Sequence, residues 1–370
     1  MLTPAPFDKL RLRQYPPVKQ GQAYNGADTL LVQAALASGC PGEQILVVND
    51  EFGALCLALR AGALWTDSWL ASQSLKNNLA ANEASAVKLC WSTEPLSEIV
   101  AKNSCALIVM RVPKQQAYFE YQLSHLATVL PVGTTVLVAG MDKHLSPATA
   151  KLLETYIGPT ERHRGQRKAR MFTCMKDSRR PAPYAEIGEY FCEPLNSNLI
   201  SMANVFAREK MDIGSRFLLE NIAGLEASDS IIDLACGNGI IGLSALSQGL
   251  CKKLLLCDES AMAIESARRN AQNVVPGRDI SFHHGDGLIG YTGDPVGLIL
   301  CNPPFHLNHA VDETVGRRLL VQAAAHLLEG GSLCLVANRH LNYLPVLKRE
   351  FKRVEKLAQN GKFIIWKASR

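Results

Sequence analysis

The sequence lacks any apolar run that reaches the roughly 18 to 20 residues needed to cross a bilayer. Its first 19 residues carry four prolines and no apolar core of the signal-peptide kind. The eleven cysteines are scattered and include no Cys-x-x-Cys pair, which disfavours both a disulfide framework and a metal site. These absences predict a cytoplasmic protein with free thiols, no membrane anchor and no bound metal.

The chain has 370 residues, of which 47% are hydrophobic and 20% charged, so two domains with ordinary cores are expected. Its net charge of +5 is concentrated in one place. Residues 159–180 carry eight basic and two acidic side chains, whereas the flanking parts are close to neutral. This segment is either a solvated linker or a phosphate-binding connection, since clustered arginine and lysine are typical of nucleic-acid contacts. The candidates for RNA contact in it are Arg164, Arg167, Lys168 and Arg170.

The two halves of the chain repeat one pattern of strand, turn and small-residue helix, at residues 45–55 and 231–241. In each half an acidic residue follows the next strand, Asp67 in the first and Asp258 in the second. Strands that alternate with helices predict a mostly parallel, doubly wound α/β sheet in each half. We expect a first domain over residues 1–157, a basic linker over 158–200 and a second domain over 201–370.

The two turns differ chemically. The second half has Gly237 and Gly239 where the chain turns from strand to helix, and glycine lets a ligand approach the backbone. The first half has Glu51 in place of the first glycine, followed by Phe52. A glutamate would occupy the space of a ligand and repel its carboxylate, so the first copy is expected to have kept the fold and lost the site.

Acidic residues follow the strands of the second half at positions suited to a nucleoside cofactor. Asp233 precedes the glycines, Asp258 follows the next strand and is placed to accept from ribose hydroxyls, and Asp286 follows the third strand and could accept from an adenine amino group. The predicted cofactor-binding residues are Asp233, Gly237, Gly239, Asp258, Asp286 and Asn302.

The fourth strand of this half runs into Asn302-Pro303-Pro304-Phe305-His306. Two prolines hold the backbone extended and leave carbonyl acceptors without neighbouring N–H donors. The Asn302 amide oxygen and the Pro303 carbonyl can then accept both hydrogens of one amino group, and Phe305 can stack on a flat ring. We predict that Asn302, Pro303, Pro304 and Phe305 are catalytic and that His306 contacts the substrate.

The combination of Asp-x-x-Cys-Gly-Asn-Gly, Asp258 and Asn-Pro-Pro-Phe resembles S-adenosylmethionine-dependent amino-group methyltransferases, and more narrowly the ribosomal RNA guanine-N2 methyltransferases. The segments 203–217, 302–310 and 336–343 strengthen this resemblance, and the last two are nearer to the enzymes of large-subunit RNA. One departure is Ala235, where the family more often has glycine.

The resemblance implies two tandem class I methyltransferase folds with a degenerate first copy. It implies S-adenosyl-L-methionine as cofactor, 23S ribosomal RNA as partner and methylation of the N2 amine of a guanine that is splayed from its stack. We expect a monomer. A small-subunit (16S) guanine methyltransferase, a protein-glutamine or DNA-adenine methyltransferase, a nicotinamide-dependent oxidoreductase and a non-catalytic RNA-binding module stay open as alternatives. A second basic region is predicted as a helix at residues 343–357, where Lys348, Lys352 and Lys356 recur every four residues.

Overall fold

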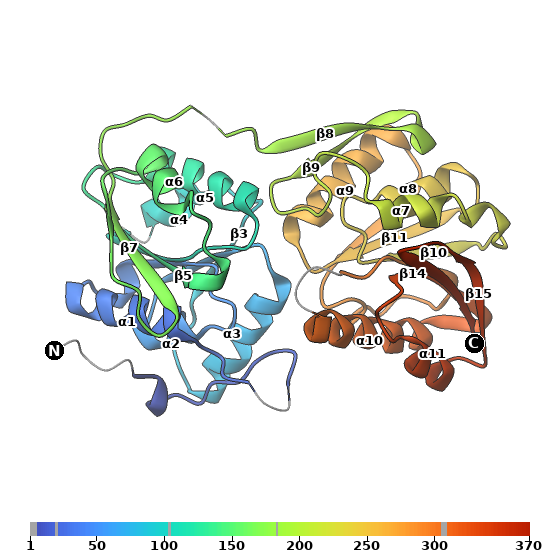
Figure 1. Ribbon diagram of the computed structural model, residues 1–370, viewed down its shortest axis with the longest axis horizontal. Coiled ribbons are helices and arrows are strands. Elements are labelled where there is room, and N and C mark those ends of the chain that lie inside the picture. The colour runs from blue at the N-terminus through green and yellow to red at the C-terminus, as the bar shows by residue number, and fades with distance from the viewer. Residues whose placement is uncertain (1–5, 19–20, 103–104, 183, 305–308) are drawn as a thin grey trace. The chain divides into compact units, whose positions relative to one another are not determined.

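The computed structural model describes residues 6–18, 21–102, 105–182, 184–304 and 309–370. Two compact units divide the chain, 1–186 and 187–370. Each has a central sheet with helices on both faces (Figure 1). The expected fold class, two Rossmann-like α/β sheets in tandem, is confirmed.

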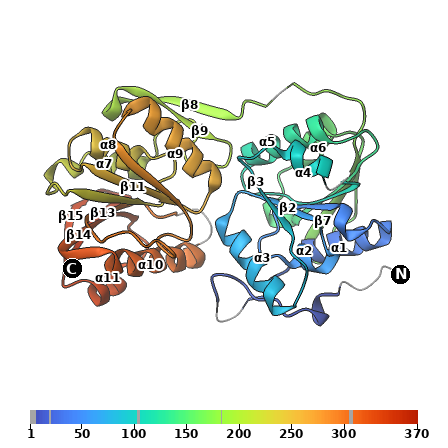
Figure 2. The ribbon, with the colours of Figure 1, turned by 180° about the vertical axis from the view of Figure 1, so that it is seen from behind.

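The first unit contains a seven-stranded sheet in the order β3-β2-β1-β4-β5-β7-β6. Strands β1 to β5 are parallel, β7 pairs antiparallel with β5, and β6 pairs antiparallel with β7. Helices α1 to α3 lie on one face of this sheet and α4 to α6 on the other (Figures 1 and 2). The elements are α1 (Gly26–Ser38), β1 (Ile45–Val48), α2 (Ala54–Leu59), β2 (Ala63–Thr66), α3 (Trp69–Ala81), β3 (Lys88–Trp91), α4 (Leu96–Lys102), β4 (Leu107–Arg111), α5 (Gln116–Val129), β5 (Thr135–Met141), α6 (Thr149–Tyr156), β6 (Thr160–Arg162) and β7 (Ala169–Met175).

The second unit repeats this topology, with the sheet order β12-β11-β10-β13-β14-β16-β15. A separate hairpin, β8–β9, precedes the sheet along the chain. The elements are β8 (Ile187–Cys192), β9 (Ser197–Met202), α7 (Ile213–Leu219), β10 (Ser230–Leu234), α8 (Ile240–Ser247), β11 (Lys253–Asp258), α9 (Ala261–Val274), β12 (Asp279–His284), β13 (Val296–Cys301), α10 (His309–Ala325), β14 (Leu327–Asn338), α11 (Leu344–Glu350), β15 (Arg353–Gln359) and β16 (Phe363–Ser369).

The central strands of both sheets are buried on both faces, as parallel strands covered by helices must be. All four residues of β1 are buried, and Ile231 to Leu234 of β10 are likewise inaccessible. The aliphatic run of β1, and that of β10 interrupted by Asp233, lack the alternation of a half-exposed strand and made these strands predictable from the sequence.

The interval 158–200 is not the linker that the sequence suggested. Strands β6 and β7 complete the first sheet, because β7 pairs with β5 and buries Ala169, Phe172 and Cys174, and Met171 between them packs partly buried against the core. The hairpin β8–β9 belongs to the second unit, and the boundary between the units along the chain falls between residues 186 and 187. The high density of basic residues masked the two short strands in the sequence.

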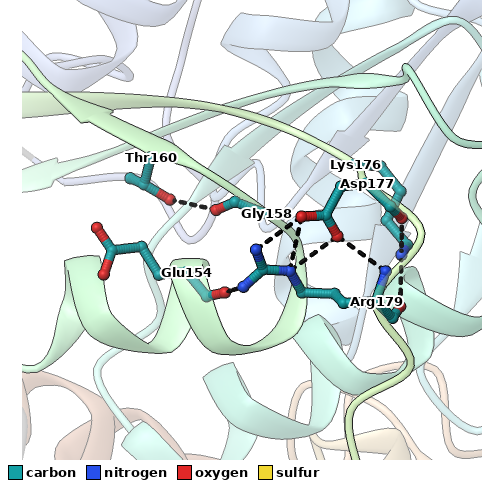
Figure 3. A network of polar contacts seen from close by, with 6 residues as sticks. All are labelled: Glu154, Gly158, Thr160, Lys176, Asp177 and Arg179. Atoms are coloured by element: carbon teal, nitrogen blue, oxygen red, sulfur yellow. Dashed lines mark hydrogen bonds and ion pairs between the residues drawn. The ribbon is translucent and has the colours of Figure 1, made fainter.

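Part of this basic segment is used internally. Arg179 forms an ion pair with Asp177 at 2.6 Å and donates to the carbonyl of Glu154 in α6. Lys176 is buried and donates to the carbonyls of Asp177 and Arg179 at 2.6 and 3.0 Å (Figure 3). Arg179 thereby fastens the chain after β7 to α6, and both cations are hydrogen-bonded within the first unit.

The helix predicted over 343–357 is wrong in its second half. Helix α11 ends at Glu350, and residues 353–359 form β15, which pairs antiparallel with β16 at the sheet edge. Lys356 therefore belongs to an edge strand, where charged side chains discourage pairing with another chain. Its four-residue spacing from Lys352, which precedes the strand, has no helical cause.

Candidate active site

The glycine loop of the second unit connects β10 to α8 at the carboxyl edge of the sheet. Ala235, Gly237 and Gly239 all have positive φ, at 64°, 55° and 86°. A Cβ added to Gly237 would meet nothing within 4 Å, whereas one on Gly239 would lie 3.2 Å from Ala267 of α9. Gly237 thus leaves room for a ligand, and Gly239 permits the close approach of a helix.

A third glycine, Gly242, completes with Gly237 and Gly239 a Gly-x-Gly-x-x-Gly sequence, a pattern that is also found in dinucleotide-binding proteins. A Cβ on Gly242 in α8 would lie 2.8 Å from Leu256 and 2.9 Å from the Cβ of Asp233. This residue serves the packing of helix on sheet. The Gly-x-Gly-x-x-Gly pattern therefore has a structural cause in this unit that needs no nicotinamide cofactor.

Asp258 ends β11 directly opposite this loop. One of its carboxylate oxygens accepts from the Gly237 N–H at 2.9 Å, and the other accepts from the Ser260 N–H at 3.0 Å. Its side chain is partly exposed. A carboxylate oriented by two backbone donors retains lone pairs for further hydroxyl groups.

Asp233 lies underneath the loop and is fully buried. Its Oδ2 accepts from the Gly242 N–H at 2.7 Å, and its Oδ1 finds no partner among the described residues. Burial raises the pKa of this carboxyl to about 7, against the lowering effect of the Gly242 bond. It orients the first turn of α8, and direct contact with a cofactor stays a prediction for this residue.

Asp286 follows β12 and is also buried, at 2% exposure. Its Oδ1 accepts from Nε and Nη2 of Arg318 in α10, at 3.1 and 2.6 Å. Contact of Asp286 with an adenine stays a prediction. Arg318, 32 residues away, carried no sequence signal for this pairing.

Asn302 follows the last residue of β13 and is half-buried, while Pro303 is buried and Pro304 exposed. The Asn302 Nδ2 donates to Oγ of Ser215 at 2.9 Å and to Oδ2 of Asp212 at 3.3 Å. Both partners come from the start of α7. The predicted residues Phe305 and His306 lie outside the described residues.

The glycine loop is supported from behind by the β8–β9 hairpin. Asn238 donates from Nδ2 to the Tyr190 hydroxyl and to Ser201 Oγ, each at 3.1 Å. Asn270 of α9 donates to the carbonyls of Asn238 and Ile200, each at 2.9 Å. These bonds hold the loop in one conformation, and no pattern in the sequence predicted them.

The first unit shows what became of the same edge in the other copy. Asn49 and Gly53 have positive φ, at 62° and 78°, and flank the turn from β1 to α2 as Ala235 and Gly239 flank theirs. The spacing places Glu51 at the position of Gly237. The expected replacement of that glycine by glutamate is therefore consistent with the backbone.

Strand pairing corrects the equivalence assumed for Asp67. Val48 pairs with Trp65 as Leu234 pairs with Cys257, so Thr66 holds the position of Asp258. The helix caps agree, since Ser68 and Ser260 each accept from the backbone three residues on. Asp67 corresponds to Glu259, and the first copy has no carboxylate at the position of Asp258, the residue predicted to accept from the ribose.

The end of the fourth strand is changed as well. Ile45 pairs with Leu107 as Ile231 pairs with Leu298, which places Arg111 at the position of Asn302. Arg111 forms an ion pair with Asp28 of α1. The first copy thus presents a cation where the second presents an amide.

Within the described residues, no helix is long and apolar enough to span a membrane, and no cluster of three or more His, Cys, Asp or Glu side chains could hold a metal ion. All eleven cysteines are free thiols, ten of them buried.

Two family models match the chain, the RLMG N-terminal domain over residues 2–178 and the methyltransferase small domain over residues 196–367. The chain is 37% identical to ribosomal RNA large subunit methyltransferase G of Alcanivorax borkumensis, over 98% of this chain and 95% of that protein. It is 38% identical to the protein of the same name from Pseudomonas paraeruginosa, over 94% of each. Among solved structures, a T. thermophilus 16S rRNA N2 methyltransferase in complex with AdoMet and guanosine matches with a TM-score of 0.77 and 21% identity, over 100% of this chain and 98% of that one.

Proposed function

The chain belongs to the ribosomal RNA large subunit methyltransferase G family, and from that membership we propose that it transfers a methyl group from S-adenosyl-L-methionine to the N2 amine of a guanine in 23S ribosomal RNA. The observation that carries the proposal is the pairing of an open glycine loop facing Asp258 with an amide acceptor at Asn302, on one edge of one sheet.

The residues at this edge fit the cofactor. Gly237 leaves space beside the backbone, and Asp258 offers a carboxylate already oriented by the loop. S-adenosyl-L-methionine supplies an activated methyl group on a sulfonium. We assign Gly237, Gly239 and Asp258 to holding it, with Asp233 shaping the loop from below and Asp286 beside the Arg318 pair.

Asn302 and Pro303 are assigned to the amine. The Asn302 Oδ1 and the Pro303 carbonyl accept its two hydrogens, and these bonds strengthen as positive charge grows on the nitrogen during transfer. A neutral acceptor suffices because the proton can pass to water after the methyl group has moved. Phe305 is proposed to stack on the base and His306 to contact the RNA.

The RNA is proposed to bind the first unit through the β6–β7 hairpin. Gln166 and Ala169 exchange two backbone hydrogen bonds of 2.9 Å, and Arg167 and Lys168 between them both have positive φ, at 54° and 58°. Such two-residue turns favour asparagine and glycine. Long basic side chains in this strained conformation point to a function that offsets the cost.

The charges of this hairpin are accessible. Arg164, Arg167 and Lys168 are exposed, and of these three and Arg170 only Arg170 has an acidic partner within the described residues, Asp142 at 3.3 Å. With Lys176 and Arg179 hydrogen-bonded within the first unit, the remaining positive charge of the segment lies mainly on this hairpin, and Arg180 lies outside it. Lost cofactor residues and retained basic charge together support RNA binding as the role of the first unit.

The test is transfer of labelled methyl groups onto separate substrates: protein-free 23S RNA, protein-free 16S RNA, assembled subunits, DNA and glutamine-containing peptides. N2-methylguanosine in 23S RNA, identified by mass spectrometry of the nucleosides, is the expected product. Label in 16S RNA, in adenine or in peptide would establish one of the alternatives.

A further inference from the structure

We infer that Ser215, together with Asp212, is a positioning residue that fixes the side-chain amide of Asn302 with its oxygen toward the substrate amine. This inference rests on the proposed function of Asn302 as the amine acceptor. Neither residue touches the reacting atoms in this assignment. Both act through the orientation of one amide.

The partners of the amide determine which way it faces. A carboxylate can only accept a hydrogen bond, and Oδ2 of Asp212 lies 3.3 Å from the Asn302 nitrogen. The Ser215 hydroxyl accepts from the same nitrogen at 2.9 Å. If the amide turned over, its oxygen would face the carboxylate, and the two acceptors would repel each other. The NH2 group therefore belongs on the α7 side.

Asp212 is itself held in place. It is the N-cap of α7, and its Oδ2 accepts from the Ser215 N–H at 3.0 Å. One carboxylate oxygen thus joins the helix start to the strand end. The orientation of Asn302 is built into the capping of a helix rather than left to a mobile side chain.

The oxygen of the amide is left without a donor. Oδ1 of Asn302 is buried at the level of the atom and has no hydrogen-bond partner among the described residues. A buried acceptor without a donor is unfavourable, and such groups are rare in folded proteins. An incoming amine supplies the missing donor. A freely rotating amide would not keep its oxygen turned toward that amine.

The first unit supports this arrangement independently. Asp28 is three residues after the N-cap Asn25 of α1, as Ser215 is three residues after Asp212. Asp28 pairs with Arg111, which holds the position of Asn302. In both copies the same helix position determines the same strand-end side chain, and only the second copy leaves an acceptor free.

The decisive variant is Ser215→Ala, which removes the hydroxyl and keeps the helix. We expect the methylation kcat to fall about tenfold, the worth of one hydrogen bond, while the KM for RNA and the cofactor Kd stay within twofold. Ser215→Thr restores the hydroxyl and should recover most of the rate. In an Asn302→Ala background, Ser215→Ala should cost nothing more. A full rate in Ser215→Ala, or an equal further loss in the double variant, overturns the inference.

A second readout does not depend on the RNA. In protein labelled with ¹⁵N-asparagine, the side-chain NH2 signals of Asn302 are identified by their loss in Asn302→Ala. We expect these signals to shift and to exchange faster with solvent in Ser215→Ala, and to return in Ser215→Thr. Unchanged signals in Ser215→Ala refute the positioning role. Shifted signals in a protein that methylates no 23S RNA would instead refute the proposed function and leave the positioning intact.

Discussion

Thr66 occupies in the first sheet the register position that Asp258 occupies in the second. Each side chain accepts from the N-cap serine two residues on, Thr66 at 3.2 Å and Asp258 at 3.0 Å. The local turn has therefore been kept while the carboxylate has been lost. A hydroxyl can satisfy one backbone donor, but it cannot replace a charged acceptor for two ribose hydroxyls.

Cofactor binding should accordingly depend on one residue of this pair. Asp258→Ala should weaken cofactor binding about a hundredfold or more, because hydroxyl groups lose a charged acceptor. Thr66→Ala is the matched control and should leave the affinity unchanged. Calorimetric titration measures both and should find one site per chain. Two equivalent sites, or weaker binding in Thr66→Ala, would disprove the decay of the first copy.

The strained turn of the β6–β7 hairpin predicts that relieving the strain stabilises the protein and weakens its binding of RNA. Replacing Arg167 and Lys168 by asparagine and glycine should raise the free energy of unfolding by about 1 kcal/mol, since both residues suit positive φ. The same change should weaken RNA binding and flatten its dependence on salt. Each lost phosphate contact contributes about 0.7 to 0.9 units to the slope of log affinity against log salt concentration, so the loss of two contacts should flatten it by about one and a half units.

The control variant removes lysines that lie at the amino ends of parallel strands rather than in the hairpin turn. Lys88 and Lys253 begin β3 and β11, Lys252 precedes β11, and all three are exposed. Changing them to glutamine should leave RNA affinity nearly unchanged. If the control weakens RNA binding as much as the turn variant does, the hairpin has no special role.

The buried carboxyl of Asp233 predicts a pH dependence of stability. Its pKa is about 7 in the folded protein and about 3.9 in an unfolded chain. The folded state therefore binds more protons between these values, and the free energy of unfolding should fall as pH rises from about 4 to about 7. The largest slope that one group can give is about 1.4 kcal/mol per pH unit.

Asp233→Asn should remove this contribution, so the difference between wild type and variant should change with pH up to about 7. Asp50 of the first unit is the matched comparison, because burial raises its pKa to about 6. Asp50→Asn should change the dependence only below that value. Denaturant unfolding across pH 5 to 8 tests both. If the free energy of unfolding changes with pH in the same way for wild type and Asp233→Asn, burial does not raise the pKa of this carboxyl.

The repeat and the parallel sheets were predictable because each rests on a local pattern. Strand β10 is an aliphatic run interrupted by Asp233, and the two prolines after Asn302 mark the strand end, whereas the chemistry of Asn302 stays a prediction. The equivalence of Thr66 and Asp258 was not predictable, since it depends on the register in which each strand pairs with its neighbour.

Contacts between distant segments were also beyond the sequence. Ser215 meets Asn302 across 87 residues, and Arg318 meets Asp286 across 32. The basic run at 159–180 hid two strands, because its charge obscured the buried residues Ala169, Phe172 and Cys174, which do not follow a simple alternation. Lys356 was misassigned for a related reason, since only Val354 and Ala358 of its strand pack against the core and the remaining pattern sets no clear period.

The most direct test of the account is the methylation state of ribosomal RNA in cells that lack this protein. Nucleosides from purified 23S and 16S RNA are mapped by mass spectrometry after complementation with wild type, with Asn302→Ala or with Thr66→Ala. We predict that one N2-methylguanosine disappears from 23S RNA in these cells and returns with wild type and with Thr66→Ala. It should not return with Asn302→Ala, whose rate is expected to fall by about 10² to 10³. An unchanged 23S map, or full restoration by Asn302→Ala, would contradict the central claim.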